Sequence, residues 1–259
     1  YAGLQWLVLI RLLPIGGDTL VGNYALAQAV VAPVIGFFAF LMRPLWVSGA
    51  INEISAGNVL SVRIATGALA LIVTIAITLM FGIRINVLIF IYVLTSKFLD
   101  TISDILAGIF DRQGKSSTSG FLLIMKSALL SLLIIIGWIV SFDFFTTILT
   151  LIIFQLFSVF VEWKISGAAR PSNFFSFSEW FSLFPLGTAF FAALNSLVAS
   201  ISGFFPRYLL EFFSNRETVG YFSTIYVPVI IIQMVATGLS QTHLYKLSKI
   251  VQIGNLKRI

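Results

Sequence analysis

Cysteine is absent from the 259-residue chain, histidine occurs once, at His243, and charged residues make up only 10%. The absence of cysteine excludes disulfide frameworks, thiolate metal sites and cysteine nucleophiles. With one histidine, acid-base catalysis would have to use carboxylates. The sequence also lacks a phosphate-binding loop, a dinucleotide fingerprint, a zinc-binding helix motif and a serine-nucleophile elbow. We therefore expect no enzyme activity, no metal and no cofactor.

Apolar residues are abundant instead. They make up 59% of the chain, with 26 phenylalanines, and the mean hydropathy is +1.03. Soluble domains are about 45–50% apolar and about 25% charged. Many apolar runs lack charge over roughly 20 residues, the length that crosses a bilayer as a helix. Spanning strands would alternate apolar and polar residues, which Leu129–Trp138 does not. The sequence predicts an all-α, polytopic transmembrane helical bundle.

Polar interruptions divide these runs into about eight helices. We expect the first to be truncated, because the chain is apolar from Leu4 onward, and Pro185 to separate an interfacial piece, Phe174–Phe184, from the seventh span. The stretch Ser166–Ser178 is the most loop-like connection. We expect it to divide an N-terminal lobe, 1–166, from the start of a C-terminal lobe, 167–259, whose remainder we expect to be missing. The predicted helices cover residues 1–13, 20–42, 58–82, 86–110, 118–141, 144–163, 180–212 and 218–242.

The basic residues predict the orientation of these helices, because cytoplasmic loops are enriched in Lys and Arg. The connections after the second, fourth, sixth and eighth helices, with their helix ends, hold eleven of them, and the opposite side holds four. The N-terminus is therefore predicted to be cytoplasmic, and the net charge of +6 follows from topology rather than from a nucleic-acid partner. The eleven are Arg43, Arg63, Arg112, Lys115, Lys126, Lys164, Arg170, Lys246, Lys249, Lys257 and Arg258; the four are Arg11, Arg84, Arg207 and Arg216.

The fourth predicted helix carries the densest set of charges. Lys97, Asp100 and Asp104 are spaced three and four residues apart, so they share one face with Gly108 and Asp111. Charges at membrane depth are costly unless they face protein or water. One interpretation is that Lys97 and a carboxylate neutralise each other within the helix. The other is that the stripe lines an aqueous cavity, where Lys97 binds an anionic group and Asp100 or Asp104 takes up a proton or sodium ion.

A second cluster lies at the outer end of the seventh predicted helix. Arg207 and Glu211 have the spacing of an i, i+4 ion pair. Alternatively, Arg207 is kept free for bidentate contact with phosphate, and Glu211 is a further candidate for ion coupling. Arg11, at the outer end of the first helix, is a weaker candidate for substrate binding, and snorkelling is the alternative. Asn195 is one of several uncharged polar residues that either line the same cavity or join helices. The others are Gln28, Gln155, Gln233 and Gln241.

Three stretches of the chain resemble a known family. Residues Gly22 to Pro33, with Leu41-Met42-Arg43, resemble the second helix of bacterial polysaccharide flippases of the multidrug, oligosaccharidyl-lipid and polysaccharide exporter superfamily. SKFLDTISDILAGIFDRQ, residues 96–113, is similar to that family's fourth helix, and Lys126 falls where a basic residue often opens the fifth. FPRYLLEFFSNRETVGYFS, residues 205–223, followed by Gly238, Gln241 and Leu247, is similar to helices seven and eight of O-antigen and capsule repeat-unit flippases.

The resemblance implies a transporter of twelve or more helices in two lobes that rock around a cationic cavity. Its cargo would be an oligosaccharide repeat unit linked through pyrophosphate to undecaprenol, moved from the cytoplasmic to the outer leaflet of the bacterial inner membrane. Lys97, Arg207, Arg11 and Asn195 would bind it. The implied partners are membrane lipids, a polysaccharide polymerase and chain-length proteins.

Two alternatives stay open. A multidrug or toxin exporter with a cationic cargo should prefer an acidic cavity without Lys97 and Arg207. A membrane glycan polymerase or ligase should show a long outer loop with clustered polar residues.

Overall fold

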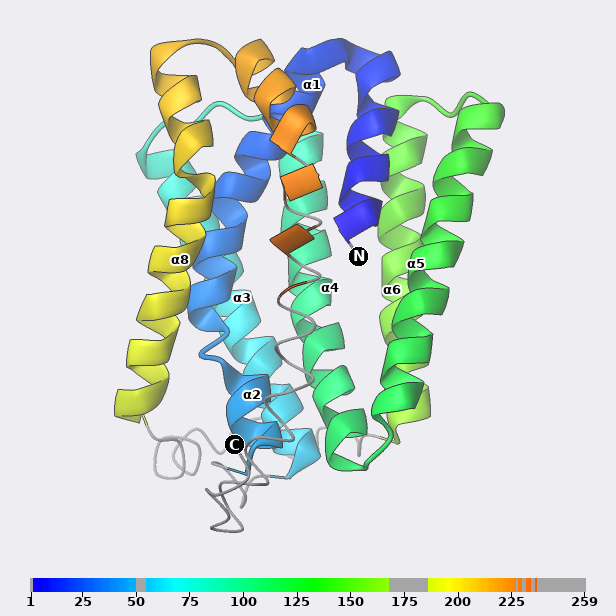
Figure 1. Cartoon of the computed structure of the whole chain (residues 1–259), viewed down its shortest axis with the longest axis vertical. Helices are drawn as coiled ribbons and strands as arrows, with labels where there is room; N and C mark the ends of the chain where they lie inside the picture. The colour runs from blue at the N-terminus through cyan, green and yellow to red at the C-terminus, as the bar shows by residue number, and fades with distance from the viewer. Residues whose placement is uncertain are drawn as a thin grey trace.

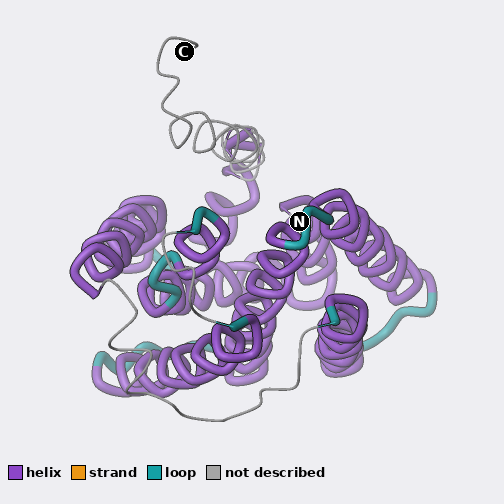
Figure 2. The backbone as a smooth tube through the Cα atoms, turned by 90° about the horizontal axis from the view of Figure 1, so that it is seen from below, coloured by secondary structure: helices purple, strands orange, loops and turns teal. Residues whose placement is uncertain are grey.

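The structure is a computed structural model that describes residues 2–49, 55–167, 186–226, 228–229, 232–233 and 236. The described residues form helices joined by short loops, and no strand occurs among them (Figures 1 and 2). The all-α prediction is confirmed. Residues 216–226 are also helical. The helices are α1 (Ala2–Phe38), α2 (Met42–Val47), α3 (Ala56–Met80), α4 (Val87–Arg112), α5 (Ser116–Ile139), α6 (Phe144–Ser166) and α8 (Leu186–Phe213).

The first two predicted helices carry one label, α1, which joins two helices across a sharp kink. Gly16 and Gly17 leave helical geometry there, and Gly17 has φ +63° and ψ −166°, a conformation that only glycine adopts readily. Figure 1 shows the two arms of α1 running in opposite directions on either side of this kink. The described part of the chain carries seven named helices where eight helices were expected, and the short α2 among them was not predicted. The predicted interfacial piece, 174–184, lies outside the described residues.

Within the described residues, five helical stretches are long and apolar enough to cross a membrane: Arg11–Val47, Ala56–Met80, Ser116–Ile139, Phe144–Ser166 and Ala189–Phe213. The 26-residue α4 is missing from this set. It carries Lys97, Asp100, Asp104, Asp111 and Arg112. It packs against α1, α2, α3, α5 and α6, so its polar groups can be satisfied by neighbouring helices instead of by water.

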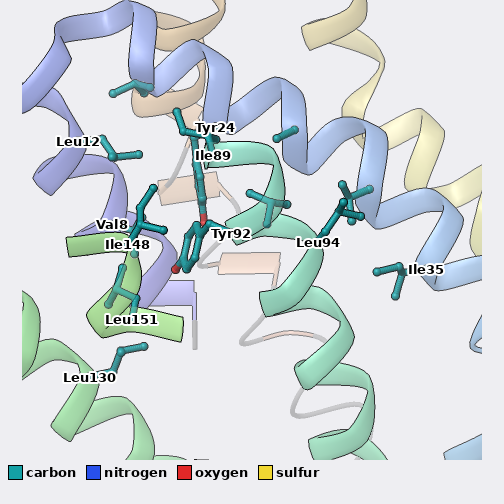
Figure 3. Packing of buried hydrophobic residues seen from close by; sticks show 14 of the residues in the cluster. Val8, Leu12, Tyr24, Ile35, Ile89, Tyr92, Leu94, Leu130, Ile148 and Leu151 are labelled. Carbon is teal, nitrogen blue, oxygen red and sulfur yellow. The ribbon is translucent and has the colours of Figure 1, made fainter. Parts of the chain in front are cut away.

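Two apolar clusters hold the bundle together around α4. The first joins both arms of α1 with α4, α5 and α6, and Figure 3 shows Tyr24 and Tyr92 beside Ile89, Val8 and Ile148 within it. The second cluster joins α2, α3 and α4 through buried Met42, Trp46, Leu60, Ile105 and Ile109. Large apolar side chains such as Ile72, Leu79, Ile124, Ile139 and Phe157 stay exposed. Outward apolar faces of this kind suit contact with lipid.

Helix ends carry ordinary capping chemistry. The Ser55, Asn86 and Asp143 side chains each accept a backbone N–H at the start of α3, α4 and α6. Hydrogen bonds from Thr146, foremost that of its side chain, lower the pKa of the Asp143 carboxyl. At the other end of α6, Gly167 adopts φ +60°, the left-handed conformation that commonly ends a helix. The described part of α6 thus ends at the predicted lobe boundary, while the division into lobes stays a prediction.

Candidate functional site

Arg43 of α2 lies against the second half of the charged stripe on α4. Its guanidinium contacts Asp104 at 2.8 Å and Asp111 at 2.9 Å. A Cβ at Gly108, between the two carboxylates, would lie 3.1 Å from Cγ of Arg43. The glycine therefore makes room for the arginine stem to lie across α4. Asp104, predicted as an ion-coupling residue, already has a cation beside it.

Replacing Arg43 with Gln is expected to destabilise the fold only modestly, by about 1 kcal/mol. The Arg43 and Asp104 side chains are 31% and 43% exposed, so solvent screens the charges that the substitution leaves behind. The midpoint of thermal unfolding of the purified full-length protein in detergent measures the effect. A loss above about 3 kcal/mol would show that this pair behaves like a buried one.

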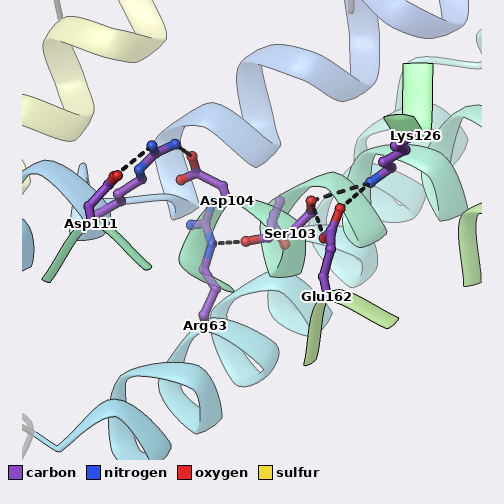
Figure 4. Close-up of polar contacts among 8 residues, drawn as sticks. Arg63, Ser103, Asp104, Asp111, Lys126 and Glu162 are labelled. Atoms are coloured by element: carbon purple, nitrogen blue, oxygen red, sulfur yellow. Dashed lines mark hydrogen bonds and ion pairs between the residues drawn. The ribbon is translucent and has the colours of Figure 1, made fainter. Parts of the chain in front are cut away.

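A second polar cluster lies between α4, α5 and α6 (Figure 4). The Lys126 ammonium lies 3.4 Å from Glu162 Oε1 and donates a hydrogen bond of 3.3 Å to Ser103 Oγ. Ser103 Oγ in turn donates to Glu162 Oε2 at 2.5 Å. The Lys126 and Glu162 side chains are only 5% and 10% exposed. The buried charges neutralise each other and are hydrogen bonded, as the low dielectric of an interior requires.

A third polar cluster lies one heptad earlier on α4 and α6. Gln155 Nε2 donates to Ser96 Oγ at 2.9 Å and to Asp100 Oδ1 at 3.3 Å. Ser96 and Ser103 are seven residues apart, as are Gln155 and Glu162. The repeat matches the seven-residue period of helices packed at a small angle. Gln155 is 4% exposed, and its Oε1 atom is buried without a hydrogen-bond partner.

Lys97 follows Ser96 directly on α4 and is half-buried. It makes no hydrogen bond or ion pair to any residue in the described part of the chain. The interpretation that Lys97 and a carboxylate of its own helix neutralise each other is therefore wrong. Asp104 pairs with Arg43, and Asp100 accepts from Gln155.

Arg207 on α8 is 6% exposed and has no carboxylate partner among the described residues. Its Nε donates to Ser223 Oγ at 3.1 Å, and its guanidinium lies 4.9 Å from the ring centroid of Phe204.

Glu211 pairs with Arg216, at 3.2 Å, rather than with Arg207. The expected i, i+4 pair on α8 is therefore wrong. Arg216 also donates to Asn23 Oδ1 at 2.8 Å, and the same oxygen accepts the backbone N–H of Asn86 at 3.1 Å. This network ties α8, the segment 216–226, α1 and the start of α4 together. It makes Glu211 part of a structural junction and leaves Arg207 without its expected counter-charge.

Arg11 is buried and does not snorkel. One of its terminal nitrogens donates to the carbonyl oxygens of Gly137 at 3.1 Å and Phe142 at 2.5 Å, at the end of α5. A cation at that position stabilises the helix terminus. Arg11 also borders a small, mostly apolar pocket lined by Tyr24, Tyr92 and Thr147 among others. Neither Lys97 nor Arg207 lines this pocket, so a chamber shared by those two cations stays a prediction.

Asn195 is exposed on α8. The face of α8 next to it packs against α1, since a Cβ at Gly36 would meet Ser196 Oγ at 3.5 Å. Gln28 Nε2 donates to the Tyr24 hydroxyl at 3.0 Å, and Gln155 joins α6 to α4. Gln28 and Gln155 thus make polar contacts inside the bundle. Gln241 lies outside the described residues. The role of Asn195 in substrate binding stays a prediction.

The prediction from the sequence did not include Glu162 among the site residues, and it placed Arg43 only among the basic residues of the connections and helix ends. The seven-residue spacing of Ser96 with Ser103 and of Gln155 with Glu162 could have indicated the polar contacts between α4 and α6.

The fold and the site together define an all-helical protein with several candidate membrane spans and a central helix rich in charge. The chain is similar to the capsular polysaccharide biosynthesis protein CapF of Staphylococcus aureus, with 27% identity over 253 residues. The similarity covers 95% of this chain and 62% of that protein, so the chain spans less than two thirds of its relative. No family model and no solved structure matches the chain.

Proposed function

We propose that the protein is a flippase for lipid-linked oligosaccharides in surface polysaccharide biosynthesis. The cargo is a repeat unit joined through pyrophosphate to undecaprenol, and it moves from the cytoplasmic to the outer leaflet by alternating access. The protein carries out no covalent chemistry in this proposal. Its location is the bacterial inner membrane, with the N-terminus in the cytoplasm.

The observation that carries the proposal is the pair of cations without a described carboxylate partner, Lys97 and Arg207. Each is buried or half-buried in a long helix, where an uncompensated charge is costly. The other buried cations of the described spans have their charge met by carboxylates or by backbone carbonyl oxygens, as at Lys126 and Arg11. An anionic pyrophosphate would supply the missing countercharge, through hydrogen bonds to arginine and an ion pair with lysine.

The surroundings support this proposal over the two alternatives. A cationic drug would be repelled by Lys97 and Arg207, so a multidrug exporter fits less well. A glycan polymerase or ligase would use a long outer loop, whereas the described connections 82–86, 140–143 and 214–215 are short. The likeness to a protein named for capsular polysaccharide biosynthesis supports the pathway.

Replacing Lys97 or Arg207 with Ala in the full-length protein is expected to lower surface-glycan display about tenfold or more. The magnitude follows from losing a charge-assisted contact worth about 1.5–3 kcal/mol. Display is measured as the binding of a glycan-specific reagent to intact cells. The amount of lipid-linked repeat units that accumulate is measured alongside it. Both values are normalised to the abundance of the protein in the membrane.

Lys115→Ala is the matched control, because Lys115 is an exposed cation between α4 and α5. It should leave display unchanged. Lys97→Arg keeps the charge and should recover much of the display that Lys97→Ala loses. Unchanged display in Lys97→Ala and Arg207→Ala would reject the cargo role of these residues, and equal losses in the Lys115 control would show a general charge effect.

A further inference from the structure

The backbone carbonyl of Ala29 in α1 lacks the donor that a helix normally provides. Pro33 lies four residues later, inside the same helix, and proline has no backbone N–H to donate to that carbonyl. Ala29 is fully buried, so bulk water does not reach its oxygen. An unpaired backbone group is costly in a helix that crosses a bilayer. The carbonyl of Ala29 therefore needs a donor from outside its own helix.

The hydroxyl of Tyr208 in α8 supplies this donor. It donates a hydrogen bond to the Ala29 carbonyl oxygen, although the two residues are 179 positions apart in the chain. Figure 1 shows α8 beside the second arm of α1, against which it packs. The carbonyl that Pro33 leaves free is thus paired by a side chain of a neighbouring helix.

Pro33 also divides the second arm of α1 into two parts with different contacts. Before Pro33, the Asn23 side chain accepts a hydrogen bond of 2.8 Å from Arg216. After Pro33, α1 and α8 meet at small residues, where a Cβ at Gly36 would lie at an ordinary 3.5 Å from Ser196 Oγ. The first part is therefore held by hydrogen bonds to segments late in the chain. The second part meets α8 more loosely.

We propose that Tyr208 is a positioning residue that makes Pro33 a hinge in α1. A bend at Pro33 breaks no backbone hydrogen bond, and Tyr208 keeps the Ala29 carbonyl paired while the helix bends. The part of α1 after Pro33 turns together with α3, because Arg63 of α3 donates to the Phe38 carbonyl at 3.4 Å. The inference rests on the proposed function and deepens it, because it names the place where α1 changes shape during transport.

A double-mutant cycle of thermal unfolding tests the hydrogen bond on the purified full-length protein. Tyr208→Phe is expected to lower the melting temperature by about 2–6 °C, because it leaves the Ala29 carbonyl unpaired. Pro33→Ala restores the backbone N–H and with it the helical hydrogen bond to Ala29. In the Pro33→Ala background, Tyr208→Phe should therefore lower the melting temperature by less than about 1 °C.

Pro14→Ala is the matched control for this cycle. Pro14 is exposed and lies in the first arm of α1, away from the Ala29 carbonyl in the chain. Tyr208→Phe should therefore lower the melting temperature as much in the Pro14→Ala background as in the parent. Equal effects of Tyr208→Phe in the parent and in the Pro33→Ala background would overturn the inference, and so would a Tyr208→Phe variant as stable as the parent.

The role of the hinge in transport requires a variant that loses activity without losing stability. Pro33→Ala should leave the melting temperature unchanged or higher, since alanine is a much better helix former than proline. It should lower surface-glycan display about threefold or more, normalised to protein abundance, since α1 no longer bends easily.

Three outcomes of this experiment have different consequences. Display at the parent level in Pro33→Ala would overturn the hinge. A loss of display together with a lower melting temperature would show only a structural role for Pro33 and would overturn it as well. Display at the parent level in Lys97→Ala and Arg207→Ala would instead reject the proposed function, and it would leave the result of the melting-temperature cycle unaffected.

Discussion

Replacing Lys126 with Met is expected to lower the free energy of unfolding by about 3–5 kcal/mol, because the substitution leaves Glu162 as an unpaired buried charge. The Glu162 side chain is 10% exposed, and its described polar contacts are Lys126 and Ser103. Methionine keeps the length of the lysine stem and removes only the ammonium. The midpoint of thermal unfolding of the purified full-length protein measures the loss.

Two controls separate charge from packing at this cluster. The double variant Lys126→Met, Glu162→Leu removes both charges, and it should recover most of the lost stability, since apolar replacement of a buried pair is often neutral or favourable. Lys164→Met removes an exposed cation of α6 whose ammonium lies 5.5 and 5.4 Å from the ring centroids of Phe160 and Trp163. It should cost about 1 kcal/mol at most. A double variant as unstable as the single one would contradict the assignment of the loss to Glu162.

Much of the fold could be predicted because the bilayer requires it. Uncharged runs of about 20 residues become helices, since lipid offers no partners for backbone polar groups. The observed α3, α4, α5 and α6 start and end within a few residues of the predicted ranges. The kink at Gly16-Gly17 falls where the sequence predicts a break between two helices. The short α2 was missed, because RPLW contains a proline and is only part of a six-residue helix.

The partners of the charges could not be predicted from spacing along one helix. Lys97, Asp100 and Asp104 do share a face, yet the cation that pairs with Asp104 is Arg43, 61 residues away in the chain. Likewise, Glu211 takes Arg216 from beyond the end of α8 in place of Arg207, four residues earlier. Pairing of buried charges depends on which helices pack together. The periodicity of the sequence predicts the face of the helix on which a side chain lies, but it does not predict the residue with which that side chain pairs.

Gly22 of α1 is expected to be the most sensitive glycine of the junction between α1 and the segment 216–226. A Cβ there would lie 2.0 Å from the backbone oxygen of Arg216, so Gly22→Ala must push the segment 216–226 away from α1. The same junction has a second close approach, in which a Cβ at Gly220 would lie 2.3 Å from the Asp18 oxygen. Because backbone atoms cannot rotate aside, we expect a loss of about 3 kcal/mol or more.

Gly36→Ala is the matched control for this prediction. It adds the same methyl group to the same helix, but the new Cβ would meet Ser196 Oγ at 3.5 Å, an ordinary contact. Alanine favours a helix over glycine by about 0.5–1 kcal/mol, so this control should be neutral or slightly stabilising. Thermal unfolding of the two variants measures the difference. Equal stability would mean that the segment 216–226 does not pack on α1 through Gly22. It would also contradict the hydrogen bond between Arg216 and Asn23, which depends on that packing.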